Sequence, residues 1–437
     1  MRVSSRKAGM LALGLGAAFI STAATWAADI KVIHAGELLA VPGKAPTKNQ
    51  TVVIEDGRIK EVRDGFVAAA DFGEDATLVD LKDSFVMPGL MDMHVHIQGE
   101  LGPDQFREGL QMSAEDTAMR SVMYAERTLQ AGFTTVRDLG SDPQSVFALR
   151  KATANGWVDG PRIVAAGSSV AATGGHGDVD GLRHELLEKF TSKTICDGAD
   201  DCLRAVRYAV KFGADVIKIT ATGGVLSDTN TGTGQQMTDD ELKIIMDTAH
   251  GLGRKVAAHA HAAEGINAAL RAGVDSIEHG SYADAESIRL FKKSGAYLVP
   301  TLLAGDTVVN MAKTSNFMST DIKAKAIRVG GDMIENFQRS YKGGVKIAFG
   351  TDSGVSKHGT NAQEAVLMFE AGMTAMDILK SATVNAADLI DMSDSLGTIE
   401  AGKIADIIAT DGSPLEDIKE LLDVDFVMKD GRTVKQQ

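Results

Sequence analysis

Histidine, lysine and aspartate side chains follow several short apolar segments, in an order that suits a metal centre. They are His94 and His96 in GLMDMHVHI, Lys218 in ADVIKIT, His259 in KVAAHAH, His279 in SIEHG and Asp352 in IAFGTDSG. Each segment is a run of small or β-branched apolar residues, which is typical of a buried strand. Neutral imidazole and carboxylate are the ligands that zinc and similar divalent ions select. The set therefore predicts a hydrolytic centre in which metal ions activate a water molecule.

His94 and His96 are expected to bind one ion together. They are separated by one residue on an extended strand, so both side chains point to the same face. An isolated pair of this kind is often two polar core residues, but this pair has further candidate ligands at comparable positions. Asp352 follows the last predicted strand, which lies beside the first if the strands close into a barrel. It would then complete the same metal site.

Lys218 is the unusual member of the set, because a cationic lysine would be repelled by metal ions and is costly to bury unpaired. Its position is explained if the amine adds carbon dioxide and becomes a carbamate, an anion that can bridge two metals. The alternative is a salt bridge between Lys218 and an acidic residue of the same core, such as Asp352.

Eight segments between residues 88 and 395 are predicted to be strands, most of them separated by amphipathic helical segments that end at glycine. The strands are expected to end near Ile97, Asp138, Ala165, Ile219, His259, His279, Thr301 and Asp352. This alternation predicts an α/β fold with a parallel (β/α)8 TIM barrel, whose active groups lie at the carboxyl ends of the strands. The metal-binding candidates lie there. A doubly wound sheet is the alternative, but no Gly-rich dinucleotide fingerprint follows the first strand.

The two ends of the mature chain are expected to form one small β-sandwich domain, from residues 28–87 and 396–437. Asp56-Gly57 and Asp430-Gly431 each stand between alternating apolar segments, which is a strong hairpin signal. Neither stretch has a long helical period.

These motifs together resemble the amidohydrolase superfamily, in its binuclear-metal branch. The resemblance covers essentially the whole mature chain and includes the closing segment LGTIEAGKIADIIATDGSPLEDI. It implies two divalent ions, with zinc the usual expectation, and a metal-bridging hydroxide that attacks the substrate. His94 and His96 would hold the first ion, and His259 and His279 the second. Lys218 would bridge them as an N6-carboxylated lysine, and Asp352 would bind the first ion and act as the base.

Three further histidines are candidates for the reaction. His176 in AATGGHGD and His261 in KVAAHAH could donate to the oxyanion of the tetrahedral intermediate or contact substrate. His261 could equally orient a neighbouring ligand. His358 in SKHGTNAQE could contact substrate or cap a helix.

Within the superfamily, the chain is most similar to the Xaa-Pro dipeptidase-like branch, which includes amidases that hydrolyse ochratoxin A. The segments that carry this similarity are TATGGVLSDTN, AAHAHAAEGINAALRAGVDSIEHG and HGTNAQEAVLMFEAGMT. This similarity implies cleavage of the amide bond to a C-terminal amino acid, in dipeptides or N-acyl amino acids, and a homo-oligomer, an octamer among the options. Two alternatives remain open. The same centre supports phosphotriesterase or lactonase chemistry, and a barrel of this kind could bind metal or ligand without catalysis.

The first 27 residues have the pattern of a signal peptide, with basic Arg2, Arg6 and Lys7, an apolar stretch and small residues before a cleavage site after Ala27. Its roughly 11 apolar residues fall short of the roughly 20 needed to span a bilayer. We therefore expect an exported protein, periplasmic or secreted, without a membrane anchor after cleavage.

The formal charge is −14, and removal of the three basic residues makes it −17. Such a charge argues against a nucleic-acid partner.

The chain has two cysteines, Cys196 and Cys202, in a Gly/Asp-rich stretch. In an oxidising compartment they are expected to form a local disulfide. Metal ligation is the alternative, but no third thiol or neighbouring histidine supports it.

Overall fold

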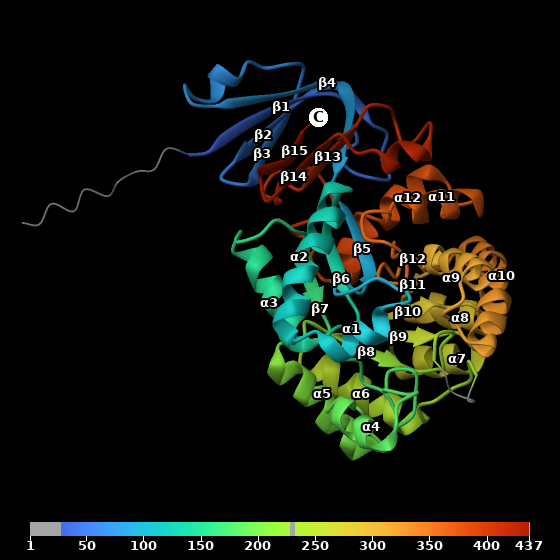
Figure 1. The fold of residues 1–437 in the computed structure, drawn as a ribbon. Helices are drawn as coiled ribbons and strands as arrows, with labels where there is room; N and C mark the ends of the chain where they lie inside the picture. The colour runs from blue at the N-terminus through green and yellow to red at the C-terminus, as the bar shows by residue number, and fades with distance from the viewer. Residues whose placement is uncertain (1–27, 228–231, 437) are drawn as a thin grey trace, which may run out of the picture.

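The computed structural model of the chain describes residues 28–227 and 232–436. Figure 1 shows a sheet made of blue and red segments, from the two ends of the chain, next to a larger unit of strands and helices. The predicted signal peptide, residues 1–27, lies outside the described residues. None of the helices described is both long and apolar enough to cross a membrane.

The two chain ends pair in one seven-stranded sheet of order β15-β14-β13-β4-β1-β2-β3. Its strands are β1 (Ile30–Leu38), β2 (Thr47–Glu55), β3 (Arg58–Asp64), β4 (Thr77–Pro88), β13 (Ile407–Thr410), β14 (Phe426–Lys429) and β15 (Arg432–Gln436). The N-terminal and C-terminal segments meet where β4 pairs antiparallel with β13. Both predicted hairpins are present. Asp56-Gly57 and Asp430-Gly431 form the turns with positive φ at both positions, as two-residue hairpins favour.

Eight parallel strands form the second unit, and they lie in a sheet of three and a sheet of five. They are β5 (Leu90–Val95), β6 (Phe133–Asp138), β7 (Arg162–Ala165), β8 (Val216–Thr220), β9 (Lys255–Ala260), β10 (Ser276–His279), β11 (Tyr297–Val299) and β12 (Lys346–Ile347). Parallel bridges connect the two sheets at both seams, from Val170 to Ile219 and from Val95 to Ser353. The carboxyl ends of strands from both sheets therefore lie together.

Helices connect these strands and pack around them (Figure 1). They are α1 (Gln105–Gln111), α2 (Ala114–Gln130), α3 (Pro143–Ala154), α4 (His184–Phe190), α5 (Ala199–Phe212), α6 (Asp239–Gly251), α7 (Ala263–Ala272), α8 (Ala285–Ser294), α9 (Leu302–Thr314), α10 (Thr320–Lys342), α11 (Gln363–Glu370), α12 (Ala375–Ser381) and α13 (Val384–Leu389). Capping boxes at Ser113, Thr238 and Asp284 begin α2, α6 and α8. Left-handed Gly273 and Gly295 end α7 and α8, as the sequence pattern indicates.

Candidate metal centre

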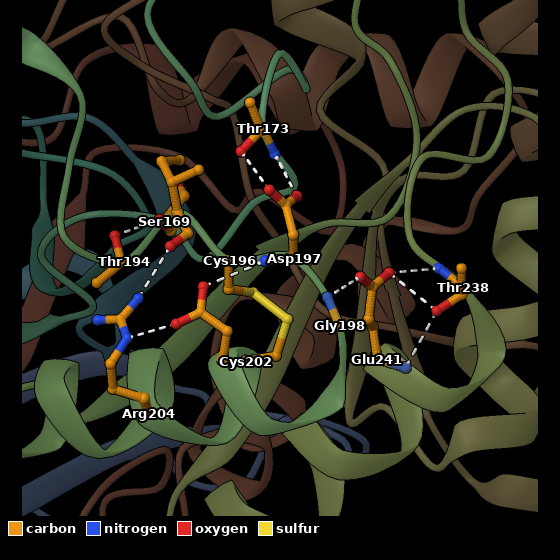
Figure 2. Close-up of a disulfide and its surroundings, with 12 residues drawn as sticks. Ser169, Thr173, Thr194, Cys196, Asp197, Gly198, Cys202, Arg204, Thr238 and Glu241 are labelled. Carbon is orange, nitrogen blue, oxygen red and sulfur yellow. Dashed lines mark hydrogen bonds and ion pairs between the residues drawn. A yellow bond between two sulfur atoms is a disulfide. The ribbon is translucent and has the colours of Figure 1, made fainter. Parts of the chain in front are cut away.

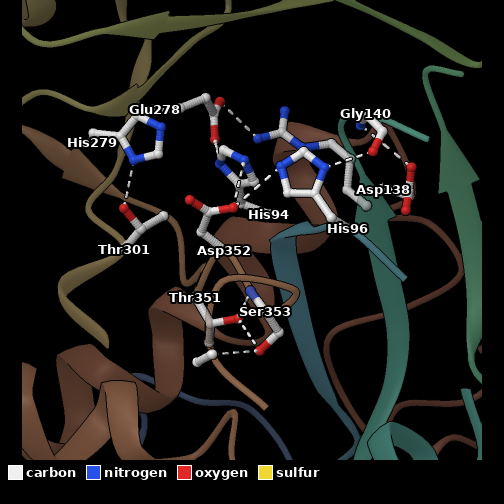
Figure 3. Close-up of polar contacts among 12 residues, drawn as sticks. His94, His96, Asp138, Gly140, Glu278, His279, Thr301, Thr351, Asp352 and Ser353 are labelled. Carbon is white, nitrogen blue, oxygen red and sulfur yellow. Dashed lines mark hydrogen bonds and ion pairs between the residues drawn. The ribbon is translucent and has the colours of Figure 1, made fainter. Parts of the chain in front are cut away.

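Imidazole rings from three strands gather at the carboxyl ends of the parallel strands. The ring centroid of His94 lies 5.4 Å from that of His96 and 5.2 Å from that of His279. The ring of His259 lies 4.7 Å from the ring of His279. Figure 3 shows His94, His96 and His279 around the carboxylate of Asp352. The structure thus brings residues that are far apart in the sequence into one cluster.

Asp352 is the carboxylate of this cluster. One ligand atom each from His94, His279 and Asp352 lies within 4.8 Å of the others. Oδ1 of Asp352 is buried without a hydrogen bond among the described residues. It lies 3.2 Å from Nε2 of His96 and 3.6 Å from Nε2 of His94. A buried carboxylate oxygen that faces imidazole nitrogens is the donor set that a zinc-like cation binds, so these residues fit a metal.

A neighbour outside the cluster contacts the Nδ1 atom of each of these three histidines. Nδ1 of His96 lies 2.6 Å from the carbonyl oxygen of Gly140, and Nδ1 of His279 lies 2.7 Å from Oγ1 of Thr301. Nδ1 of His94 lies 3.0 Å from Oε2 of Glu278. The carbonyl and the carboxylate can only accept from Nδ1–H, which leaves Nε2 of His96 and His94 available to a metal, and the Thr301 hydroxyl orients the ring of His279.

Burial keeps most of the clustered histidines neutral. It lowers the pKa of His94 and of His176 to about 4, and that of His261 to about 3. The pKa values of His259 and His279 are also well below the usual range, and burial is again the largest cause. A neutral imidazole keeps the lone pair that a metal ligand needs.

Lys218 lies on β8 with 4% of its surface exposed, and it lines the same cavity as the histidines. Burial lowers the pKa of its amine to about 8, although Glu278 and Asp352 oppose the shift. A larger fraction of the amine is therefore neutral near pH 7 than for an exposed lysine. The neutral form is the one that can react with carbon dioxide. Among the described residues, Asp352 lies against the imidazoles of His94 and His96, and no salt bridge joins it to Lys218.

His259 lies in the cluster, but its Nε2 atom is turned toward the backbone. That atom lies 3.3 Å from the carbonyl oxygen of Gly223. The ring is 4.2 Å from the ring of His176 and 4.7 Å from that of His261. The ring of His259 thus lies next to those of His279, His176 and His261, and the ring of His261 is itself 5.1 Å from that of His279.

His176 and His261 both line the cavity above the centre, whereas His358 does not. Nδ1 of His261 lies 2.7 Å from Oγ of Ser281, and Nδ1 of His176 contacts Oγ of Ser227. His358 is buried at the back of a neighbouring loop, where Nε2 lies 3.0 Å from the carbonyl oxygen of Gly99. The structure therefore does not bring His358 to the cavity for a substrate contact.

A buried ion pair behind His94 was not anticipated from the sequence. Arg137 on β6 donates from Nη2 to Oε1 of Glu278 at 2.9 Å and from Nε to the carbonyl of Met93 at 2.7 Å. Although burial opposes it, the guanidinium of Arg137 lowers the pKa of Glu278 to about 2. The ionised carboxylate then accepts from Nδ1 of His94. The signal was an arginine and a glutamate inside two strands that are buried along almost their whole length.

Asp92, another residue missed in the sequence, ties β5 to the segment that carries Asp352. Its carboxylate accepts from Oγ1 of Thr351 at 2.6 Å, from Nδ2 of Asn361 at 2.7 Å and from the backbone of His94 at 3.1 Å. The backbone N–H of Asp352 also donates to the carbonyl of His94 at 2.7 Å. These bonds hold Asp352 in a left-handed conformation with φ of 58°.

Thr301 precedes α9 but does not cap it. Its φ is 51°, a left-handed conformation that β-branched residues rarely adopt, and its hydroxyl contacts His279 instead. The buried carboxylate of Glu364, on α11, accepts from the backbone N–H groups of Leu302 at 2.9 Å and Leu303 at 2.6 Å. Glu364 thus replaces the missing side-chain cap and leaves Thr301 free to orient His279. Glu364 is a positioning residue.

Replacing Glu364 with alanine is expected to lower both stability and metal affinity. Two buried N–H groups would lose their acceptor, at about 1–3 kcal/mol each, and Thr301 would be free to turn back to the helix. Thermal unfolding of the metal-free protein and competition with a chelator measure the two effects. Glu370→Ala, at the exposed end of the same helix, is the matched control. Unchanged metal affinity in Glu364→Ala would contradict the link to His279.

The predicted disulfide is present between Cys196 and Cys202, whose Cα atoms are 4.9 Å apart (Figure 2). It joins the first turn of α5 to the segment around Cys196, which contacts the loop that follows β7. The backbone N–H of Cys196 donates to the carbonyl of Ala171 at 2.9 Å. The hydroxyl of Thr194 donates to the carbonyl of Ser169, a cavity residue, at 2.7 Å. The disulfide therefore stabilises a segment that supports the wall of the cavity.

The sequence pattern of the amidohydrolase family matches residues 85–434, which is most of the chain. The chain belongs to the amidohydrolase family. The ochratoxinase of Aspergillus niger is 32% identical over 94% of this chain and 88% of its own. This family member is therefore a hydrolase with relatives among amide-cleaving enzymes.

Two solved structures show how widely the family fold is shared. A Xaa-Pro dipeptidase with methionine bound in its active site is 41% identical, with a TM-score of 0.88 over 93% of this chain and 100% of that one. A prolidase in complex with N-methylphosphonate-L-proline is 33% identical, with a TM-score of 0.84 over 93% and 100% of the two chains. The similarity thus includes both structural units described above.

Proposed function

We propose that this amidohydrolase cleaves the amide bond to a C-terminal amino acid in dipeptides or N-acyl amino acids, with ochratoxin A as one candidate. The observation that carries the proposal is the cluster of His94, His96, His279 and Asp352 around an unbonded carboxylate oxygen. The relatives support the substrate class, because one is a dipeptidase with an amino acid in its active site and another an ochratoxinase.

The residues of the cluster would hold two divalent ions, zinc by expectation. His94, His96 and Asp352 would bind the first, and His259 and His279 the second, while Lys218 would bridge them as a carbamate. When bound, such ions lower the pKa of water and polarise a carbonyl group. His259 supports this assignment by its place beside His279, but its Nε2 must leave the carbonyl of Gly223 to become a ligand.

Asp352 is the proposed general base. Its pKa is held well below its usual range by the surrounding imidazoles of His94 and His96, despite burial. It is therefore ionised at neutral pH and can take a proton from water, then return that proton to the leaving amine. His176 and His261 line the cavity as neutral imidazoles, so each can donate one N–H to the developing oxyanion.

We also propose the finer architecture of both units. The bridges at both seams support closure of the eight strands into a (β/α)8 barrel. Apolar residues from opposite halves of the seven-stranded sheet, such as Ile54 on β2 and Met428 on β14, share one buried cluster. This supports a sheet folded onto itself as a small β-sandwich. Export through a cleaved leader and assembly into a homo-oligomer remain proposals from the sequence.

A substrate panel tests the proposed reaction. The metal-loaded protein is offered N-acyl amino acids and dipeptides that differ in the C-terminal residue, ochratoxin A, lactones and paraoxon. We expect the amides to be hydrolysed with the highest kcat/KM. Faster turnover of paraoxon or of a lactone would contradict the proposal and favour the corresponding alternative. Complete inactivity of metal-loaded protein would favour a binding role.

A further inference from the structure

We propose that an outer cavity beside the metal centre is the subsite for a bulky, apolar acyl group of the substrate. This inference rests on the proposed amidase function and adds the chemical class of the acyl half. The outer cavity has a volume of about 950 Å³ and adjoins the cavity of about 400 Å³ that holds the metal-binding candidates.

The two cavities meet at the candidate centre. His96, Gly140, His176 and Asp352 line both of them. Lys218, His259 and His279 line the inner cavity and are not among the residues that line the outer one. A substrate whose amide bond is cleaved at the shared residues therefore places the group on one side of that bond in each cavity. The site is built for a substrate with two parts.

Aromatic side chains from three separate segments line the outer cavity. They are Phe106 of α1, Phe190 of α4 and Phe317 of the connection between α9 and α10. These side chains are 64%, 43% and 39% exposed, and they are three of the six exposed phenylalanines of the described residues. Large apolar side chains gathered on one cavity suit an aromatic or extended apolar group, which would bury them.

The charges of the outer cavity indicate which half of the substrate it takes. Glu100 and Glu108 line only the outer cavity, Asp142 lines both cavities, and Arg120 is the one lysine or arginine among the outer lining residues. Arg120 is already committed, because it donates to Glu108 at 2.6 Å and to the carbonyl of Gln98 at 3.1 Å. Glu108 and Glu100 are themselves paired, with Arg120 at 2.6 Å and with Arg127 at 3.7 Å, so the described lining residues of the outer cavity offer no unpaired cation to a substrate carboxylate. The acyl half therefore lies outward, and the amino acid with its carboxylate lies inward.

The inner cavity has the walls for a single side chain. Val308 of α9 and Val329 and Met333 of α10 are among its lining residues. The two helices approach closely where a Cβ on Gly330 would lie 3.0 Å from the carbonyl oxygen of Gly305. This apolar wall fits an apolar C-terminal residue and sets the orientation of the whole substrate.

A matched substrate series tests the outer subsite. The kcat/KM values of metal-loaded protein are measured for N-acetyl-, N-benzoyl- and N-naphthoyl-phenylalanine, which differ only in the acyl group. We expect kcat/KM to rise from acetyl to naphthoyl by about tenfold or more. In Phe106→Ala and Phe317→Ala this rise should shrink by about tenfold. Phe369→Ala, an exposed position on α11 outside both cavities, is the control.

The possible outcomes distinguish a failure of the proposed outer subsite from a failure of the proposed amidase function. If N-acetyl-phenylalanine is hydrolysed but the naphthoyl preference survives in both variants, the subsite is refuted and the amidase function stands. If the variants instead change the sedimentation of the protein and leave the acyl preference intact, the phenylalanines form an interface between copies and the proposal is overturned. If none of the amides is hydrolysed, the proposed function fails, and the subsite with it.

Discussion

Replacing Lys218 with alanine is expected to abolish the tight binding of metal and to reduce amide hydrolysis by about 10³-fold or more. The reason is that the proposed bridge between the two ions would be lost, and with it several kcal/mol of charge stabilisation, where about 1.4 kcal/mol corresponds to a tenfold change in rate. Metal content measured by mass spectrometry and kcat measured on an N-acyl amino acid follow both effects. Acetate or propionate should restore part of the activity, because a short carboxylate can take the place of the carbamate.

Lys211→Ala is the matched control for this variant, because Lys211 is exposed on α5 in the segment that leads to β8. It should keep full metal content and full activity. If Lys218→Ala binds two ions and hydrolyses the amide at the wild-type rate, Lys218 does not bridge the centre. A loss of activity without any rescue by carboxylic acids would favour a purely structural role for the buried amine.

The Asp352→Asn variant is expected to lower kcat by about 10²–10⁴-fold, the range that general acid–base catalysis contributes. Asparagine keeps an oxygen that can face the metal site but cannot take the proton from water. The measurement is kcat at saturating metal and substrate, with metal content determined on the same sample. This second measurement separates the loss of the base from the loss of a ligand.

Asp394→Asn, a change to an exposed residue beyond α13, controls for the loss of one negative charge. It should leave kcat unchanged. Wild-type turnover in Asp352→Asn would contradict the proposed base. A fall in kcat that excess metal fully reverses would show that Asp352 acts as a ligand alone.

The strand ends and the candidate cluster could be predicted because they depend on local patterns. Short apolar runs flanked by glycine indicate where each parallel strand ends, and β6, β7 and β10 end at the predicted residues Asp138, Ala165 and His279. Since parallel strands end on the same side of the fold, polar residues at those ends are brought together regardless of their separation in the sequence. The Asp-Gly turns were predictable for the same local reason.

The positioning contacts could not be predicted, because they join residues that are far apart and have no characteristic spacing. The Arg137–Glu278 pair connects two strands across the interior, and an arginine within a strand does not by itself identify its partner. Glu364 caps a helix that begins 62 residues before it. His358 was a candidate for a substrate contact because its loop lies near the site. Its ring is instead buried against Tyr124. The identity of a buried partner depends on packing, which the linear pattern does not contain.

The most direct test of the account is a zinc titration of the metal-free protein, with hydrolysis of N-benzoyl-phenylalanine as the readout. We expect no hydrolysis before zinc is added, and a rise that reaches its plateau near about two equivalents per chain. Hydrolysis at the full rate by metal-free protein would contradict the account, and so would a fully zinc-loaded protein that leaves every amide intact.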